Sequence, residues 1–266
     1  MNIHNWYQKY ETDCDLKYPS QSTRRTYKSA VMKFLEYFKS EIEPKSIPNQ
    51  KIKDWLLTFT THNTRKQMQC SVNSFYKMTV KMPSKIANIP YPKKQKTLPR
   101  VIDTQCLIAA ITKITNLKHK AILMLAYSCA LRVSEVINLK IEHIDSTRMI
   151  IHIHNGKGNK DRIVKLSKLV LETLRVYFRQ YKPSDYLFNG QKKAQYTASS
   201  CGKLVKKYIA QDTHFHQLRH SGATAMLEAG TDISIIQKLL GHANIKTTMI
   251  YTHVSNNLIQ QVKTPM

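Results

Sequence analysis

Acidic residues are scarce in this chain. Its 266 residues include 17 Asp and Glu against 42 Lys and Arg, which gives a formal net charge of +25 at pH 7. The basic residues are spread over both halves of the sequence, as a clamp around a polyanion requires, and are not gathered in one tail. We therefore expect a polyanionic partner, with nucleic acid the leading candidate and a clamp around duplex DNA one arrangement that this spread of charge would suit.

Cysteines and long apolar runs are also few. The five cysteines are far apart and form no Cys-x-x-Cys pair, so we expect reduced, mostly buried thiols of a cytosolic protein. No segment approaches the roughly 18 apolar residues needed to span a bilayer. The first residues also lack a basic region followed by an apolar run. These absences predict a cytoplasmic protein with no membrane partner.

The chain lacks a phosphate-binding P-loop. The glycine-containing segment 155–161 places Asn159 where that motif requires lysine. Runs of β-branched residues at 149–154 and 162–166 predict two strands, which makes the segment the basic tip of a β-hairpin. Lys157, between two glycines, can reach away from the sheet toward a ligand, although such a lysine is more often an ordinary turn residue.

Helical spacing of apolar residues dominates the first 90 or so residues. Tyr27, Val31, Phe34, Leu35 and Phe38 form one face of a helix, and two more helices are expected at 52–59 and 64–80. Four prolines between positions 83 and 99 then interrupt regular structure. We predict a helical, DNA-clamping domain at 1–92 and a second domain at 93–266.

The second domain is predicted to be mixed, with the hairpin set among helices. The helices are expected at about 103–114, 117–130, 167–181, 197–211, 217–229 and 232–240. A further helix begins after Arg132, with Ser134 as its expected N-cap and Glu135 near its positive end. The predicted fold class is mainly α with a small antiparallel β-sheet.

Cationic side chains and a tyrosine gather near the end of the sequence. His216, Arg219 and His220 lie at i, i+3 and i+4, so they share one face at the N-terminal end of a helix, where an anion is favoured. His242 follows a glycine cap, and Tyr251 comes nine residues later. A cationic group stabilises charge on a phosphate and a tyrosine can form a phosphoester. Each of these residues alone could equally be structural.

Arg132 has two interpretations. It follows a nearly apolar helical segment, and an arginine beside a core needs an anionic partner. That partner is either a bound phosphate or a carboxylate of the chain, Glu135 or Glu142.

Taken together, several short motifs resemble those of the tyrosine recombinases of the phage integrase family. They are Ala130-Leu131-Arg132-Val133-Ser134-Glu135, Gly156-Lys157-Gly158, His216-Gln217-Leu218-Arg219-His220-Ser221, Leu227-Glu228-Ala229-Gly230, Leu239-Leu240-Gly241-His242 and Ile250-Tyr251-Thr252-His253. They occur in the family's order over residues 98–254. Two positions depart from the usual pattern: Ala130 stands where glycine is common, and Gly222 where a larger apolar residue is usual.

The resemblance implies an active site and a reaction. The catalytic set would be Arg132, Lys157, His216, Arg219, His242 and Tyr251. His216 would be the general base, the arginines and His242 would bind the phosphate, Lys157 would be the general acid, and Tyr251 would form a 3′-phosphotyrosine. No metal, ATP or other cofactor is expected.

The resemblance also implies an assembly. Two rounds of strand exchange would take place in a tetramer on DNA, with a possible accessory protein or partner recombinase. The chain is similar to compact Xer-like and mobile-element recombinases. Integration, excision, inversion and dimer resolution share the same catalytic residues, so the sequence does not separate them. Phosphate contacts are expected from eight basic side chains, Arg24, Arg25, Lys28, Arg65, Lys66, Lys93, Lys94 and Lys160.

Three other functions fit parts of the pattern. A type IB topoisomerase would use the same tyrosine chemistry to relax supercoils. A metal-dependent nuclease could use His216 and His220 with His214 or His242, although Gln217 replaces the glutamate of the zinc-protease motif and no acidic cluster is available for Mg²⁺. A non-catalytic DNA-binding protein would explain the charge but leaves the ordered catalytic set as coincidence.

Overall fold

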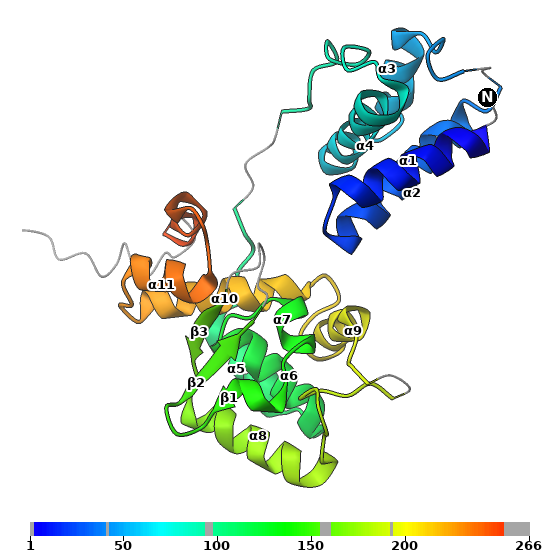
Figure 1. Cartoon of the computed structure of the whole chain (residues 1–266). Coiled ribbons are helices and arrows are strands. Elements are labelled where there is room, and N and C mark those ends of the chain that lie inside the picture. The colour runs from blue at the N-terminus through cyan, green and yellow to red at the C-terminus, as the bar shows by residue number, and fades with distance from the viewer. Residues whose placement is uncertain (1–2, 41–42, 94–97, 155–160, 192–193, 253–266) are drawn as a thin grey trace, which may run out of the picture. The chain divides into compact units, whose positions relative to one another are not determined.

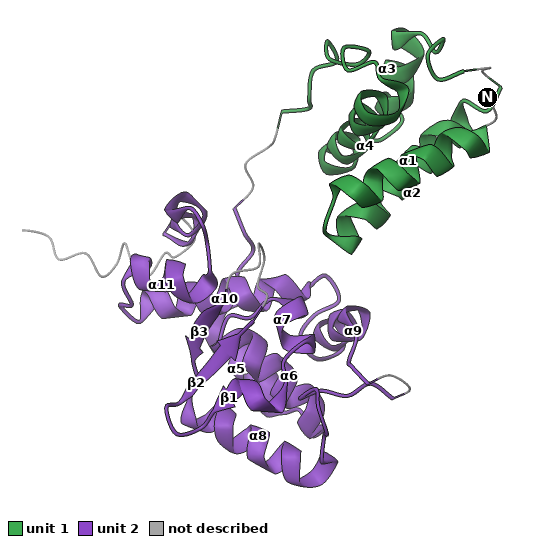
Figure 2. Cartoon of the chain, viewed as in Figure 1, with its two compact units in different colours: residues 1–96 green, residues 97–266 purple. Residues whose placement is uncertain are grey.

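The computed structural model describes residues 3–40, 43–93, 98–154, 161–191 and 194–252 (Figure 1). Most of the described chain is helical, with one small antiparallel sheet, which confirms the predicted fold class. The chain divides into two compact units, residues 1–96 and 97–266 (Figure 2). The division falls within the proline- and lysine-rich segment in which the sequence predicts a boundary at residue 92.

The N-terminal unit is helical. It contains α1 (Ile3–Lys17), α2 (Gln21–Tyr37), α3 (Asn49–Leu57) and α4 (His62–Phe75), which continues into a π-helical turn, η1 (Tyr76–Val80). Helix α1 is not among the helices that the sequence specified, because it buries only Trp6, Tyr10 and Cys14 in 15 residues. Their spacing of four keeps them on one face, but the polar residues between them hide the period.

Aromatic contacts hold this unit together. The ring of Phe34 on α2 lies 5.2 Å from Trp55 on α3 and 6.0 Å from Tyr76, in edge-on geometry. A third neighbour, Phe75 at the end of α4, lies 6.3 Å away. Each such pair contributes roughly 0.5–1.5 kcal/mol beyond its buried area. The helical face predicted around Phe34 is therefore the one that joins α2 to α3 and α4.

The C-terminal unit is built around α6 (Leu117–Ser128), whose five residues Ala121, Ile122, Leu123, Leu125 and Ala126 are buried. Five helices contact it: α5 (Thr104–Thr112), α7 (Val133–Ile137), α8 (Lys168–Tyr181), α9 (Ala198–Tyr208) and α10 (Phe215–Glu228). Helix α11 (Ile233–Leu240) packs on α10. Short 3₁₀ turns complete the unit: η2 (Ile141–His143), η3 (Ile245–Thr247) and η4 (Met249–Tyr251).

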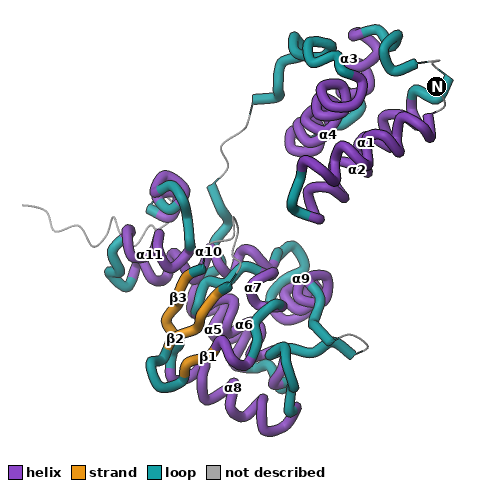
Figure 3. Tube along the Cα trace, viewed as in Figure 1, coloured by secondary structure: helices purple, strands orange, loops and turns teal. Residues whose placement is uncertain are grey.

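A three-stranded antiparallel sheet lies in this unit (Figure 3). Its order is β1 (Ile144–Asp145), β2 (Ile150–Ile153) and β3 (Arg162–Lys165). Ile151 on β2 pairs with Val164 on β3, and both side chains are buried. The predicted hairpin is therefore present as β2 and β3, whereas the two-residue β1 is too short to give a sequence pattern. The connecting residues 155–160, which include Lys157 and Lys160, lie outside the described residues.

The prediction that Ser134 caps α7 is wrong. The helix begins at Val133 and its N-cap is Arg132. The Glu135 carboxylate reaches back, and its Oε2 accepts a hydrogen bond from the Arg132 backbone N–H at 2.7 Å. Serine is the commoner cap, so the sequence favoured it. Here a glutamate three residues into the helix satisfies the N-terminal donor instead, as in half of a capping box.

The two departures from the family pattern meet where α10 crosses the end of α6. A Cβ on Gly222 would lie 2.1 Å from the carbonyl oxygen of Tyr127, so only glycine permits this approach. The same Cβ would lie 3.6 Å from the Cβ of Ala130. Ala130 itself has a φ of 48°, in the left-handed region that usually selects glycine. Gly222, which has no side chain, thus lies beside the methyl group of Ala130, the residue that stands where glycine is common.

Two absences predicted from the sequence concern the membrane and disulfides. Within the described part of the chain, no helix has both the length and the apolar character to cross a bilayer. All five cysteines are free thiols, and Cys14, Cys129 and Cys201 are buried.

Candidate active site

A buried carboxylate organises the arginines of the C-terminal unit. Glu135 on α7 is 7% exposed, and its Oε1 accepts a hydrogen bond from Nη1 of Arg132 at 2.8 Å. Arg162 at the start of β3 donates from Nη1 and Nη2 to the two oxygens at 2.6 and 2.7 Å. Nη1 of Arg219 lies 3.8 Å from Oε2. Of the two carboxylates proposed from the sequence, the partner of Arg132 is therefore Glu135.

These contacts determine the charge of Glu135. Burial opposes ionisation and raises the pKa, but the hydrogen bonds and charge of Arg162 and the contacts with Arg132 outweigh it, and the pKa falls to about 2. The carboxylate is therefore ionised at neutral pH. It fixes the two guanidinium groups that bind it in one orientation.

Arg162 belongs to this cluster, although the sequence gave no reason to place it in the site. Its side chain is 7% exposed, and Nε donates to the Leu239 carbonyl oxygen at 2.7 Å. Gly241, with a φ of 62°, passes so close that a Cβ there would lie 3.0 Å from Cδ of Arg162. Nothing in the local pattern distinguishes it from an exposed strand arginine, because its partners are 27 and 77 residues away.

Arg219 on α10 is the most buried of the arginines, at 1% exposure. Nη1 donates to the Ala130 carbonyl oxygen at 2.8 Å, and Nη2 donates to the Leu240 carbonyl oxygen at 2.7 Å. Burial, followed by the charge of Arg132, lowers its pKa to about 10. The guanidinium therefore stays charged at neutral pH, and its carbonyl partners come from the ends of two different helices.

His242 lies beside Arg219. Its Nε2 is 3.3 Å from Nη2 of Arg219, and its Nδ1 is 3.0 Å from Oγ1 of Thr248. Because an arginine only donates, Nε2 is the acceptor, and the ring proton resides on Nδ1. Burial, followed by the charges of Arg219 and other arginines, lowers the pKa of His242 to about 4, so the ring is neutral at pH 7.

Two histidines of α10 lead from this cluster toward the tyrosine. The rings of His216 and His220 meet edge-on with centroids 4.5 Å apart. Desolvation by the surrounding protein, followed by the charges of Arg219 and Arg132, lowers the pKa of His216, although its side chain remains exposed. His220 lies deeper, and burial, with the neighbouring His216 and Arg219, lowers its pKa to about 4.

Tyr251 is buried in η4, with 1% of its surface exposed. Its hydroxyl lies 3.1 Å from Nδ1 of His220, a histidine that the family resemblance leaves outside the catalytic set. Burial raises the pKa of Tyr251, and the charges of Arg219 and Arg132 offset only part of this effect. The hydroxyl is thus protonated at neutral pH, and it can donate to His220 when the ring proton of His220 is on Nε2.

Five of the six predicted catalytic residues lie in the described part of the C-terminal unit. Arg132, His216, Arg219, His242 and Tyr251 belong to one connected region on α7, α10, η4 and the segment after α11, whereas Lys157 lies outside the described residues. Among the described residues, no group of three or more His, Cys, Asp or Glu side chains is arranged to hold a metal ion. The histidine ligand set of a metal-dependent nuclease is therefore not found in this part of the chain.

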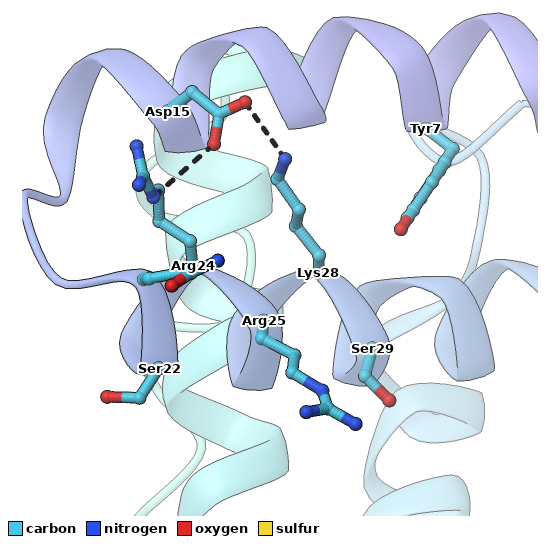
Figure 4. Close-up of a pocket in the computed structure, with 8 residues that line it drawn as sticks. Tyr7, Asp15, Ser22, Arg24, Arg25, Lys28 and Ser29 are labelled. Carbon is cyan, nitrogen blue, oxygen red and sulfur yellow. Dashed lines mark hydrogen bonds and ion pairs between the residues drawn. The ribbon is translucent and has the colours of Figure 1, made fainter. Parts of the chain in front are cut away.

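Three of the residues predicted to contact phosphates line one hollow of about 860 Å³ in the N-terminal unit, between α1 and α2. Arg24 and Lys28 both pair with Asp15, at 3.6 and 2.9 Å, whereas Arg25 points away from it (Figure 4). Lys28 also lies 3.6 Å from Glu11. These are solvent-facing pairs of the kind that a phosphate can replace.

The other predicted DNA contacts are scattered. Arg65 donates from Nε and Nη2 to the Phe59 carbonyl oxygen at 3.1 and 2.9 Å, so it joins the end of α3 to α4. Lys66 and Lys93 are exposed. Lys94 and Lys160 lie outside the described residues.

Comparisons with known proteins agree with this geometry. The model of the phage integrase family matches residues 100–257. The chain is 40% identical to the tyrosine recombinase XerA of Pyrococcus horikoshii over 67% of its length and 65% of that protein. It is 32% identical to the XerA of Thermococcus onnurineus over 93% of its length and 90% of that protein.

A solved structure extends the likeness to the fold of both units. The lambda integrase dimer bound to a COC′ core site matches with a TM-score of 0.78 and 14% identity, over 100% of this chain and 99% of that one. At this level of identity the match shows a shared fold.

Proposed function

The chain belongs to the phage integrase family of tyrosine recombinases, and we propose that it cleaves and rejoins double-stranded DNA at specific sites through a covalent bond between Tyr251 and a 3′ phosphate. The observation that carries this assignment is the cluster of Arg132, Arg219 and His242 in one connected region with Tyr251. A cationic pocket beside a tyrosine hydroxyl is what phosphoryl transfer to that hydroxyl requires.

The arginines have donors to offer a phosphate. A guanidinium has five N–H groups, and the contacts of Arg219 with Ala130, Leu240 and His242 use three of them. Arg132 contacts Glu135 through Nη1, which leaves Nη2 and Nε for a phosphate oxygen. Because Glu135 and the carbonyl oxygens already hold these groups, little reorganisation is needed when the charge on the non-bridging oxygens grows.

The reaction conserves its phosphodiester. The Tyr251 oxygen attacks phosphorus, its proton passes to His216, and the bond from phosphorus to the 5′ oxygen breaks. The departing oxygen takes a proton from Lys157, the general acid that the family resemblance assigns. One phosphoester replaces another, so no ATP is needed, and a free 5′ hydroxyl reverses the step on the same or another strand. The lowered pKa of His216 leaves it neutral at pH 7 and able to accept a proton.

Strand exchange needs more than one active site. We propose that the chain works as a tetramer on two DNA sites, with an accessory protein or partner recombinase as a further component. The basic hollow of the N-terminal unit, with Arg24, Arg25 and Lys28, is the part of this unit that we assign to the DNA backbone. Since the substrate is DNA and the thiols are free, we place the reaction in the cytoplasm.

Capture of the covalent intermediate tests this function. The protein is expressed in a host that carries its native flanking DNA, the lysate is denatured, and DNA attached to protein is sequenced at its ends. Wild type and Tyr181→Phe, which removes an exposed hydroxyl on α8, should give adducts at one defined site. Tyr251→Phe should give none. Equal adducts from wild type and Tyr251→Phe would show that another residue is the nucleophile.

A further inference from the structure

The position of Tyr251 is unsuited to immediate attack. A nucleophile must come within about 3–3.5 Å of the reacting atom, in line with the bond that breaks. With 1% of Tyr251 exposed, its ring lies in a cluster that includes Ala223, Leu227, Ile236 and Leu240. A phosphodiester outside this cluster cannot approach the hydroxyl, so the side chain has to move before it reacts.

The contact with His220 favours the unreactive form. His220 is neutral at pH 7, and its Nδ1 lies 3.1 Å from the Tyr251 hydroxyl. In the tautomer with the ring proton on Nε2, Nδ1 accepts the hydroxyl proton, and this is the tautomer that the inference uses. A hydrogen bond that needs the phenol proton stabilises the neutral phenol relative to the phenolate. The bond therefore acts in the same direction as burial, which raises the pKa of Tyr251.

The segment that carries Tyr251 is attached at a second point to the predicted phosphate site. Thr248, three residues earlier, is fully buried, and its Oγ1 lies 3.0 Å from Nδ1 of His242. The other ring nitrogen of His242 faces Arg219 at 3.3 Å. A phosphate oxygen only accepts hydrogen bonds, so it takes the Nη2 proton of Arg219, or it pairs with His242 once the ring proton moves to Nε2. Either change alters the contacts of His242, which holds the same segment.

We propose that His220 is a positioning residue that keeps Tyr251 buried and protonated without DNA, and that phosphate binding at Arg219 and His242 releases it. The inference rests on the proposed function, because it treats Tyr251 as the nucleophile. His216, on the exposed side of His220, remains the base once the phenol has left its pocket. Each active site would then be held inactive until it binds a phosphate.

A pair of substitutions at one position tests the contact. His220→Phe keeps a ring of similar size but removes the acceptor, whereas His220→Asn places a polar side-chain atom about where Nδ1 lies. DNA-free protein is treated with tetranitromethane, which nitrates accessible phenols, and nitration of the Tyr251 peptide is followed by mass spectrometry. We expect His220→Phe to nitrate about fivefold to tenfold faster than wild type, as loss of one hydrogen bond implies, and His220→Asn to stay near wild type.

Two controls protect this reading from a folding defect. Tyr177 is buried on α8, in the same unit as Tyr251, and should resist nitration in every variant. The Tyr251 nitration rate also depends on no cleavage activity, so it is informative even if the adduct experiment fails. Equal nitration of Tyr251 in wild type and His220→Phe, with Tyr177 protected in both, would overturn the proposal.

Cleavage kinetics separate the positioning role from a catalytic one. The probe is a nicked duplex that carries the site found by adduct sequencing, mixed with excess protein in a single turnover. If His220 only holds the phenol, His220→Phe cleaves at least as fast as wild type. A fall of a hundredfold or more, the size expected for loss of a general base, would contradict the proposal and make His220 the base.

Discussion

Two carboxylates, one in each unit, each pair with more than one basic side chain, but one carboxylate is exposed and the other is buried. The Asp15 side chain is 49% exposed beside Arg24 and Lys28, whereas that of Glu135 is 4% exposed beside Arg132 and Arg162. An exposed pair contributes about 0–1 kcal/mol and exchanges readily with other ions. A buried pair cannot lose one member without leaving an uncompensated charge. The comparison indicates that the C-terminal unit fixes its cations, while the N-terminal unit keeps them exchangeable.

Removal of the buried anion should give the largest effect. Glu135→Gln leaves Arg132, Arg162 and Arg219 close together with no carboxylate among them. We expect a loss of about 3–5 kcal/mol in the free energy of unfolding of the C-terminal unit, measured by urea titration. Glu142→Gln, whose side chain is 72% exposed, is the control and should change stability by less than about 1 kcal/mol. Similar losses of stability in both variants would show that burial does not make Glu135 more important than an exposed carboxylate.

Acid should reveal the same difference. The Glu135 pKa falls from an ordinary value near 4.5 to about 2 in the folded protein. A lowered folded-state pKa contributes stability that is fully present above the unfolded value and is lost as the pH falls toward the folded value. We expect the free energy of unfolding to drop between pH 5 and about pH 2 in wild type, and less steeply in Glu135→Gln. If the free energy of unfolding fell equally with pH in both proteins, Glu135 would not be the cause of the loss of stability in acid.

A methyl group at the crossing of α6 and α10 should have an intermediate effect. Gly222→Ala forces a Cβ to within 2.1 Å of the Tyr127 carbonyl oxygen, so α10, which carries Arg219, has to shift. We expect a loss of about 1–3 kcal/mol in unfolding free energy, typical of overpacking. Gly202→Ala on α9, where the added carbon meets nothing within 4 Å, should instead stabilise by about 0.5–1 kcal/mol. Denaturant titration of both variants checks the contrast.

The sequence was most informative where a local pattern carries the structure. Apolar periodicity predicted α2 and α8, a nearly continuous apolar segment predicted α6, and runs of β-branched residues predicted the hairpin. It could not predict the partners of Arg162, which come from α7 and the end of α11. It also left His220 outside the catalytic set, because the contact of His220 with Tyr251 spans 31 residues. The motifs indicated which residues share a site, but not which of them touch, because these contacts join segments that are distant in the sequence.

Neutralising the exposed anion should give the smallest change in stability and a distinct change in DNA binding. Asp15→Asn removes the carboxylate that pairs with Arg24 and Lys28. We expect the free energy of unfolding to change by less than about 1 kcal/mol. Arg24 loses this partner and Lys28 keeps only the longer contact with Glu11, so both cations become more available to phosphates. Binding to a random-sequence duplex should therefore tighten severalfold at low salt and should weaken more steeply as salt is added.

The matched control for this change is Asp54→Asn on α3. It removes the same charge from the same unit, but its carboxylate accepts a hydrogen bond from Gln50 and pairs with no cation in that contact. If DNA binding depended only on net charge, both variants would tighten equally. A larger gain and a steeper salt slope for Asp15→Asn would place the phosphate contacts at the hollow between α1 and α2. Equal salt slopes for the two variants would mean that the basic side chains of the N-terminal unit attract DNA through their total charge and not through contacts in this hollow. The exposed cations beside Asp15 would then lack a defined binding role, unlike the arginines held by Glu135.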